Sequence, residues 1–505
     1  MVPGTYIKID QIPITTTNKT DRRALRKLGS AKTLEELAWL QLRGKDRRPP
    51  TTSMEKRLRD LWSSVLQIDP ESIGADSSFL KIGGESIAAM RLIAAARAAN
   101  LSLTVVQIFK APKLCDLALL VKEAGNGSNT EMPFTAPFAL LGTKDHESFL
   151  QRCIAPAVDG GRSAIQDVVP ATDFQEQSVL DALQNPPGRY PHWIFDLPAD
   201  VDFARLQQAC VKFINHYDIL RLVFVRTEKR LWQVILAKLD PKYDIFDAGD
   251  ADMATFINSI CEQNIKRPRM LGRSFIRFIV IRHASGKHKF IFRISHAQFD
   301  GFSWASILET LWSICRQNPP SAGPSFTQYV AHAENKKDEA QRYWRSVLHG
   351  APAPVGRRMI GTIGANASDL SNPENRLTIK EIIQVRNSEQ DRSRNGVSLA
   401  TLFHAAYALV LARKLKQQQI VFGRLVTGRA MLPGHLQNVV GPTMAEVPIR
   451  VVVDAHDTVS TIAARLQAQF IEGAVYETVG MVQIIKNCTD WAGHGLEDFG
   501  WRTAF

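Results

Sequence analysis

A serine that follows two glycines could carry a covalently attached phosphate group. The tetrad Gly83-Gly84-Glu85-Ser86 stands directly before an apolar, helix-like stretch. Two glycines let the backbone turn tightly, which leaves Ser86 uncovered at the beginning of the helix. Free backbone N–H groups and the helix dipole at such a position favour a phosphoester on the hydroxyl. Taken alone, the tetrad also fits a plain helix N-cap.

A histidine and an aspartate with a fixed spacing form a second group that could do chemistry. His296 follows a β-like run, Asp300 stands four residues further on, and Gly301 comes next and can turn the chain. An imidazole at the end of a strand can project into a cleft and orient or deprotonate a nucleophile near neutral pH. The competing interpretation is a satisfied polar residue in a turn.

Ser86 requires a small helical domain to position it. Thr52 and Glu55 fit a capping box at the beginning of a helix, because each side chain can bind an unpaired backbone N–H of the first turn. Apolar residues then recur at helical spacing, at Leu58, Leu61, Trp62, Val65 and Leu66. Short helical pieces at 105–109 and 114–121 follow the helix after Ser86. The pattern predicts a four-helix bundle.

His296 requires a larger framework of alternating strands and helices. Strands are expected at 193–197 and 220–225, and helices at 203–216 and from Trp304 onward. The segments 273–282 and 287–295 are expected to pair around the Ser285-Gly286 turn. This part of the chain is therefore predicted to have an α/β fold.

The segment FLKIGGESIAAMRL, residues 79–92, resembles the attachment signature of acyl and peptidyl carrier proteins. The resemblance implies that Ser86 carries 4'-phosphopantetheine, added by a phosphopantetheinyl transferase, and that the thiol of this arm holds an acyl or peptidyl chain. The family's usual Asp before the serine is Glu85 here, which keeps the charge.

The segment SHAQFDG, residues 295–301, is similar to the HHxxxDG motif of condensation domains, which are relatives of chloramphenicol acetyltransferase. The resemblance implies a two-lobed α/β fold in which His296 is the functional histidine. Ser295 replaces the family's first histidine, and Asp300 and Gly301 take structural roles. Arg221 is a candidate ion-pair partner for Asp300.

Further motifs of that family occur in the expected order. They are DVVPATDFQEQ at 167–177, HYDILRLVF at 216–224, SFTQYV at 325–330 and VVGPTMAEVPIR at 439–450, in which Ala445-Glu446 replaces the usual Asn-Thr. The segments VPATDFQ and VGPT within these motifs, together with Ser295, resemble terminal condensation domains of fungal nonribosomal peptide synthetases. These release a peptidyl thioester by macrocyclisation or by attack of an outside nucleophile. The resemblance implies that His296 positions an attacking amine.

The N-terminal segment IPITTTNKTDRRALRKL, residues 12–28, resembles the closing motif of adenylation domains. By this match Lys19 holds the position of the catalytic lysine. Without the rest of such a domain, Lys19 is expected to be a solvated residue of a remnant. The chain also ends before the last two condensation-domain motifs, so it is interpreted as a fragment or an incomplete gene model of a larger synthetase.

Composition excludes several classes of protein. Apolar residues make up 45% and charged residues 22%, which is unlike a disordered or collagen-like chain. The six cysteines include no CxxC pair, so no metal site is expected and a reducing, cytoplasmic location is favoured. The net charge of +12 is concentrated in residues 1–60, which hold 14 Lys and Arg against 7 Asp and Glu without interleaved aromatics. Neither a nucleic-acid nor a membrane partner is expected.

The expected organisation has five parts. They are an adenylation-domain remnant at 1–30, a linker at 31–51, a carrier domain at 52–124, a flexible linker at 125–164 and a condensation domain at 165–505 that is incomplete at its C-terminus. The leading hypothesis is an amide-forming acyltransferase of terminal release, working with peptidyl or aminoacyl thioesters and other synthetase domains. The alternatives are an elongating condensation domain, and a non-catalytic carrier or docking module with an inactive lobe.

Overall fold

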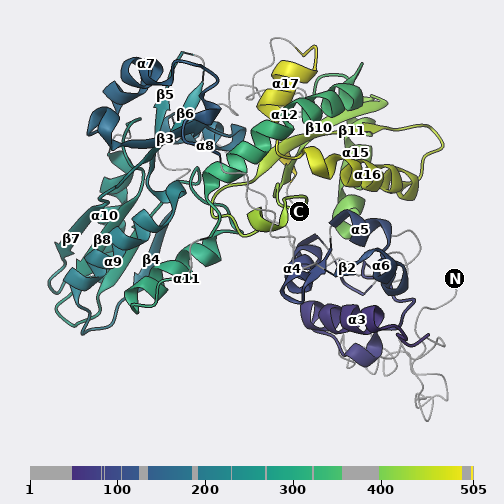
Figure 1. Ribbon diagram of the computed structural model, residues 1–505, viewed down its shortest axis with the longest axis horizontal. Coiled ribbons are helices and arrows are strands. Elements are labelled where there is room, and N and C mark those ends of the chain that lie inside the picture. Colours follow the sequence, from purple (N-terminus) through teal and green to yellow (C-terminus); the bar gives the residue numbers. More distant parts are fainter. Residues whose placement is uncertain are drawn as a thin grey trace, which may run out of the picture. The chain divides into compact units, whose positions relative to one another are not determined.

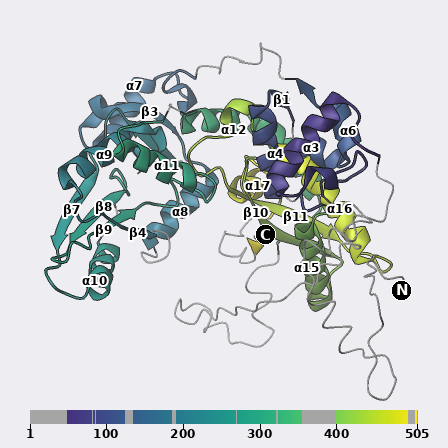
Figure 2. The same cartoon turned by 90° about the horizontal axis from the view of Figure 1, so that it is seen from below.

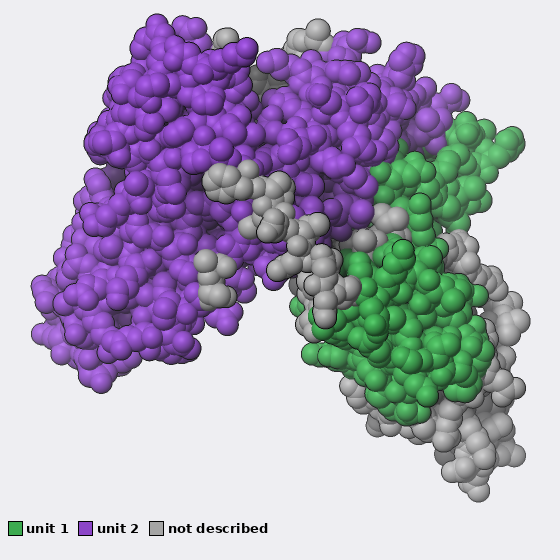
Figure 3. All heavy atoms as spheres, in the orientation of Figure 1, with its two compact units in different colours: residues 1–129, 377–411, 453–472 green, residues 130–376, 412–452, 473–505 purple. Residues whose placement is uncertain are grey.

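The computed structural model describes residues 48–491, apart from 81, 85, 104, 124–134, 185–190, 229, 268–269, 321–322 and 355–396, and in addition residues 502–503. Lys19, the adenylation-like remnant and most of the linker at 31–51 lie outside these residues. The chain divides into two units (Figure 3). Unit 1 comprises 1–129, 377–411 and 453–472, and unit 2 comprises 130–376, 412–452 and 473–505.

Unit 1 contains the expected helical bundle (Figure 1). Its helices are α3 (Ser53–Leu66), α4 (Ser86–Ala98), α5 (Val105–Lys110) and α6 (Leu114–Leu120), with a 3-10 turn η1 (Pro70–Ser72) and a two-residue antiparallel pairing of β1 (Leu101–Ser102) with β2 (Lys122–Glu123). Trp62 and Phe79 are fully buried, and their rings meet edge to face at 5.1 Å. The predicted bundle is confirmed.

The capping box at the beginning of α3 is also confirmed. The Thr52 hydroxyl accepts from the Glu55 amide at 3.1 Å, and the Glu55 carboxylate accepts from the Thr52 amide at 3.0 Å. Glu55 also accepts from the Thr51 amide at 2.7 Å and from Arg48 at 2.8 Å. These partners allow a carboxylate to be buried at 4% exposure.

Unit 2 contains two antiparallel or mixed sheets in its first half. One has the order β3-β6-β5 and consists of β3 (Ile165–Pro170), β6 (Leu231–Leu236) and β5 (Leu222–Arg226). The other has the order β4-β9-β8-β7 and consists of β4 (His192–Asp196), β9 (Lys289–Arg293), β8 (Arg277–Arg282) and β7 (Lys242–Asp247). All neighbours are antiparallel except β7 and β8.

Helices cover both faces of the four-stranded sheet (Figure 2). Phe278 and Phe292 face α9 (Phe203–His216) and α11 (Trp304–Cys315), whereas Ile279 and Ile291 face α10 (Met253–Lys266). The alternation follows from the two-residue period of a strand. Because both faces are covered, strand β9 is buried on both sides and its C-terminal end is held firmly.

The second half of unit 2 has a sheet of its own. Its order is β11-β10-β12, built from β11 (Ala445–Val452), β10 (Gln419–Val426) and β12 (Arg502–Thr503). The helices α12 (Phe326–Leu348) and α17 (Met481–Cys488) pack on it through Trp344 and Ile484. The helix α8 (Asp173–Gln184) belongs to the first half. The remaining helices, α15 (Leu399–Leu415) and α16 (Val459–Gly473), lie mostly in unit 1, where Gln467 accepts from the Ser398 amide at 3.1 Å.

The expected linker at 125–164 is wrong for its second half. Residues 139–164 form short helical elements, namely η2 (Ala139–Leu141), α7 (His146–Phe149), η3 (Leu150–Ile154), η4 (Ala155–Ala157) and η5 (Gly161–Ala164). Leu150 and Ile154 are fully buried against Val168 and Val234 of the three-stranded sheet. Apolar burial therefore makes this segment part of unit 2.

The expected secondary structure is largely confirmed. Helix α9 has the expected bounds, α11 begins at Trp304 as expected, and β8 and β9 form the expected antiparallel pair. The strand expected at 220–225 begins at Leu222, because Asp218–Leu220 forms a 3-10 turn.

We predict that Glu55→Gln destabilises the helical bundle by about 1–2 kcal/mol, because it weakens a capping box and the contact with Arg48. Backbone hydrogen bonds lower the pKa of Glu55 to about 2, with Thr52 the largest contributor. A lowered pKa means that this stabilisation is present above the ordinary value of 4.5 and is lost as the pH falls towards 2. Hydrogen–deuterium exchange of α3 at about pH 7 measures the loss. Equal exchange in Glu55→Gln and in the control Glu71→Gln, whose side chain is 83% exposed, would contradict the prediction.

Candidate functional site

Ser86 is the first residue of the thirteen-residue helix α4. The turn before it depends on both glycines. Gly83 has φ +103°, in the region that favours glycine, and a Cβ added there would meet open space. A Cβ on Gly84 would overlap the ring of Phe79, whose carbonyl accepts from the Gly84 amide at 2.8 Å. Gly84 therefore lets the turn lie directly on the core.

This arrangement fits a phosphodiester on the Ser86 hydroxyl. The serine begins a helix long enough to present free N–H groups and a dipole to an anion. Attachment of the arm at Ser86 itself stays a prediction.

His296 lies three residues beyond the end of β9. Ser295 before it is fully buried, and its hydroxyl accepts from the Ala297 amide at 3.2 Å, so this residue shapes the turn. His296 itself is half-buried. Its ring stacks on Phe299 at 4.8 Å and meets the edge of Phe174 at 5.3 Å. His296 lies in the loop between β9 and α11, residues 294–303. Its imidazole is held by one aromatic ring from this loop and by another from α8.

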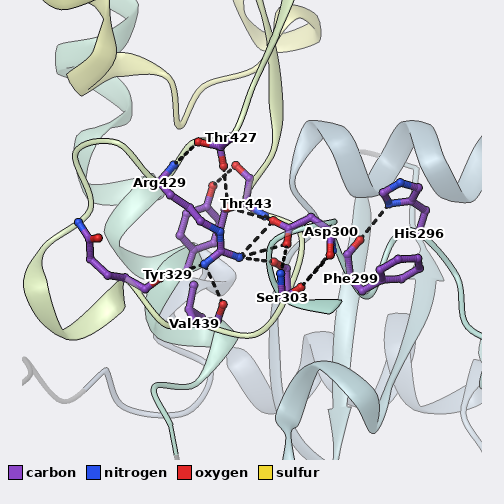
Figure 4. A network of polar contacts seen from close by, with 11 residues as sticks. His296, Phe299, Asp300, Ser303, Tyr329, Thr427, Arg429, Val439 and Thr443 are labelled. Atoms are coloured by element: carbon purple, nitrogen blue, oxygen red, sulfur yellow. Dashed lines mark hydrogen bonds and ion pairs between the residues drawn. The ribbon is translucent and has the colours of Figure 1, made fainter. Parts of the chain in front are cut away.

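One hydrogen bond determines the tautomer of His296. The Nδ1 atom lies 2.9 Å from the carbonyl oxygen of Phe299 (Figure 4). A carbonyl can only accept, so Nδ1 carries the proton and the neutral ring has its lone pair on Nε2. No hydrogen bond joins Nε2 to another residue in the described part of the chain. The loop therefore presents an imidazole nitrogen that can accept a proton.

Asp300 is buried at 1% exposure and is surrounded by donors (Figure 4). Arg429 reaches both carboxylate oxygens, at 3.1 and 3.3 Å. The Ser303 amide donates at 2.7 Å, and Thr443 donates from its amide at 3.2 Å and from its hydroxyl at 3.3 Å. Tyr329 of α12 in turn donates to the Thr443 carbonyl at 3.2 Å. Asp300 thus joins the loop of His296 to the segment between β10 and β11.

The expected pairing of Asp300 with Arg221 is wrong. Arg221 donates to the side chain of Gln166 and to the carbonyl of Leu236 instead. The residue that sequence reasoning missed is Arg429, which is 2% exposed and also donates to the carbonyls of Gln437, Val439 and Gly441. No sequence signal marked Arg429, and its position becomes clear only in the structure, where the preceding Gly428 has φ +65° and a Cβ there would overlap the Thr443 carbonyl.

The structural role expected for Gly301 has no steric explanation here. Its φ is not in the left-handed region, and a Cβ at this position would meet nothing within 4 Å. A role for Gly301 therefore stays a prediction. The unusual Glu446 lies in β11 opposite Leu425, and its carboxylate lies against Gly423, where a Cβ would overlap it.

Residues 165–497 match the condensation domain family, and residues 56–121 match the phosphopantetheine attachment site family. The chain belongs to the nonribosomal peptide synthetases. It contains a carrier domain, whose cofactor is covalently attached 4'-phosphopantetheine, and a condensation domain with the fold of chloramphenicol acetyltransferase.

Fungal synthetases resemble the chain over nearly its whole length. It is 36% identical to the nonribosomal peptide synthetase ungA' of Aspergillus campestris over 97% of this chain and 5% of that protein. It is 30% identical to the nonribosomal peptide synthetase apmB of Penicillium brevicompactum over 97% of this chain and 20% of that protein. The chain therefore spans a small part of the length of these relatives.

Solved structures support the fold. One called "holo T3CT" aligns with 70% of this chain and 79% of its own, with a TM-score of 0.56 and 24% identity. A selenomethionine form of "CT" aligns with 73% of this chain and 81% of its own, with a TM-score of 0.57 and 23% identity. At these identities the likeness concerns the fold alone.

No helix among the described residues combines the length and the apolarity that a membrane span requires. No group of three or more His, Cys, Asp and Glu side chains in this part of the chain is arranged to hold a metal ion.

We predict that Arg429→Met destabilises the condensation domain by about 3–5 kcal/mol, because it leaves the Asp300 carboxylate buried without its cation. The double variant Arg429→Met/Asp300→Leu should lose much less, since both charges are then absent. Thermal and urea unfolding of the wild type, Arg429→Met, Asp300→Leu and the double variant gives the coupling energy. Arg221→Met serves as the matched control, and a loss there as large as that of Arg429→Met would contradict the assigned pairing.

Proposed function

We propose that this chain carries an acyl or peptidyl thioester on Ser86 and condenses it with an amine, releasing the product by macrocyclisation. The observation that carries the catalytic part is the hydrogen bond from His296 Nδ1 to the Phe299 carbonyl, 2.9 Å long. In the neutral ring this bond places the proton on Nδ1 and leaves the lone pair on Nε2. Asp300 and Arg429 act indirectly, by holding the loop in place.

The phosphopantetheine arm, when attached, supplies a thiol that activates the acyl group as a thioester. The chain's own residues then have two tasks. Ser86 holds the attachment point at the beginning of α4. His296 orients the amine and accepts its proton on Nε2 while the new C–N bond replaces the C–S bond, whose electron pair leaves with the sulfur and then takes up that proton. Because an amine is already a good nucleophile, orientation contributes a large share of the acceleration.

Two observations favour terminal release. The first is the replacement of the family's first histidine by Ser295, as in the terminal subgroup that the sequence resembles. The chain is also 30% identical, over 88% of its length, to the bassianolide nonribosomal cyclodepsipeptide synthetase of Beauveria bassiana, whose name describes a cyclic product. An elongating condensation domain would instead pass a linear product to another carrier.

The attachment site is tested by incubating the chain with coenzyme A and a phosphopantetheinyl transferase. We expect the intact mass to rise by one arm in the wild type and not in Ser86→Ala, because only that hydroxyl stands at the signature position. The control Ser102→Ala removes a serine from the same domain and should still gain the arm. Loading of Ser86→Ala would place the attachment elsewhere.

Catalysis is tested with a synthetic peptidyl arm loaded on the carrier. We expect His296→Ala to slow product formation by about 10²- to 10⁴-fold, as for loss of a general base and orienting group. The control is His283→Ala, since His283 lies in a surface hairpin and bonds Ser285 at 2.8 Å. Cyclic product supports terminal release, and linear product transferred to an added carrier supports elongation. Equal rates in wild type and His296→Ala would remove His296 from catalysis, and absence of product in both would favour a docking module.

A further inference from the structure

Three consecutive residues in the first turn of α8 contact three separate parts of unit 2. The Asp173 carboxylate accepts from the Gln483 amide at 2.9 Å, in the first turn of α17. The Phe174 ring meets the His296 ring at 5.3 Å. The Gln175 side chain reaches the loop of His296 and strand β6. One helical turn thus touches the second half of the domain and the candidate catalytic loop.

Gln175 is fully buried, and both N–H groups and the oxygen of its side-chain amide form hydrogen bonds. Its Nε2 donates to the Ala297 carbonyl at 3.1 Å and to the Gln233 side chain at 2.8 Å. Its Oε1 accepts from the Thr172 amide at 3.0 Å. Gln233 also donates to the Pro170 carbonyl at 2.9 Å. The residue next to His296 is therefore anchored to α8 by a buried hydrogen bond.

The contact between Asp173 and α17 is closely packed. A Cβ on Gly480, the residue before α17, would come within 2.8 Å of the Asp173 side chain, so glycine is needed for this approach. Burial raises the pKa of Asp173 to about 6, and the Gln483 hydrogen bond acts in the opposite direction. The neighbouring charges are Glu176, which raises this pKa, and Lys337, which lowers it. Holding a carboxylate here has an electrostatic cost that the hydrogen bond to α17 partly offsets.

We propose that the first turn of α8 links the position of α17 to that of His296, with Asp173 and Gln175 as positioning residues. The inference rests on the proposed catalytic role of His296. The physical reason is that three successive residues of one helical turn cannot move independently. A displacement of α17 is passed through Asp173 to Phe174 and Gln175, and from them to the His296 ring and the Ala297 carbonyl. Asp173 does not itself contact His296 and so acts only through this turn.

The experiment compares Asp173→Ala with Asp173→Asn in the full chain carrying a loaded arm. We expect Asp173→Ala to lower kcat by roughly 10- to 100-fold with little change in KM, because a small misplacement of a catalytic group has effects of that size. Asp173→Asn keeps an oxygen that accepts from the Gln483 amide, so it should restore most of the rate. In parallel, the ring signals of His296 in a ¹H–¹³C spectrum should shift in Asp173→Ala and return in Asp173→Asn. A lower unfolding temperature with unchanged kcat and unchanged His296 signals would overturn the proposal.

A second pair of variants tests the link through Gln175. Gln175→Met preserves the volume of the side chain but loses both donors, and it should shift the His296 signals and lower kcat. The matched control, Gln177→Met, makes the same change two residues further along α8 and should do neither. The two hypotheses fail in different ways. Unshifted His296 signals in both Asp173→Ala and Gln175→Met would reject the link, whereas shifted signals together with a fully active His296→Ala would keep the link and reject the catalytic role.

Discussion

The burial of the Asp300 carboxylate is the constraint on which the condensation domain depends. A charge removed from water needs a cation and several hydrogen bonds, or it destabilises the fold by several kcal/mol. Arg429, Ser303 and Thr443 meet this need together, and two of the three come from the segment between β10 and β11. The ion pair therefore brings together residues that are 129 positions apart in the sequence. It also brings the segment between β10 and β11 onto the loop that begins at the end of β9.

That constraint explains why local and long-range features differ in how well the sequence predicts them. The capping box of Thr52 and Glu55 and the bounds of α9 depend on residues within one or a few turns, and both are confirmed. The partner of Asp300 depends on tertiary structure. Arg221 was the natural expectation because it occurs in a family motif, but its guanidinium is taken by Gln166 and the Leu236 carbonyl. Only the folded chain shows that Arg429 is the buried cation.

Buried glutamines are a second kind of residue that sequence patterns miss. Glutamine is mostly exposed in proteins, so a lone glutamine gives no reason to expect burial. Gln175, Gln233 and Gln298 are nevertheless completely buried around the loop of His296. Gln298 donates to the Ile219 carbonyl at 3.0 Å, and Gln175 holds the Ala297 carbonyl. The segment 139–164 shows the same limit for apolar residues. Its short helices lack a clear period, and their burial becomes apparent only when the sheet beneath them is present.

The contacts around the loop of His296 suggest how a condensation domain with one histidine in this motif, instead of two, could work. Ser295, in the place of the family's first histidine, is fully buried and turned towards the Ala297 amide, so it contributes shape and no imidazole. In the proposed mechanism the loop therefore offers one imidazole, that of His296, and the surrounding contacts must maintain its orientation. The Phe299 carbonyl determines its protonated nitrogen, the rings of Phe299 and Phe174 hold its plane, and Gln175 anchors the residue that follows it. Since an amine needs little help from a base, a site built in this way favours catalysis by positioning over catalysis by basicity.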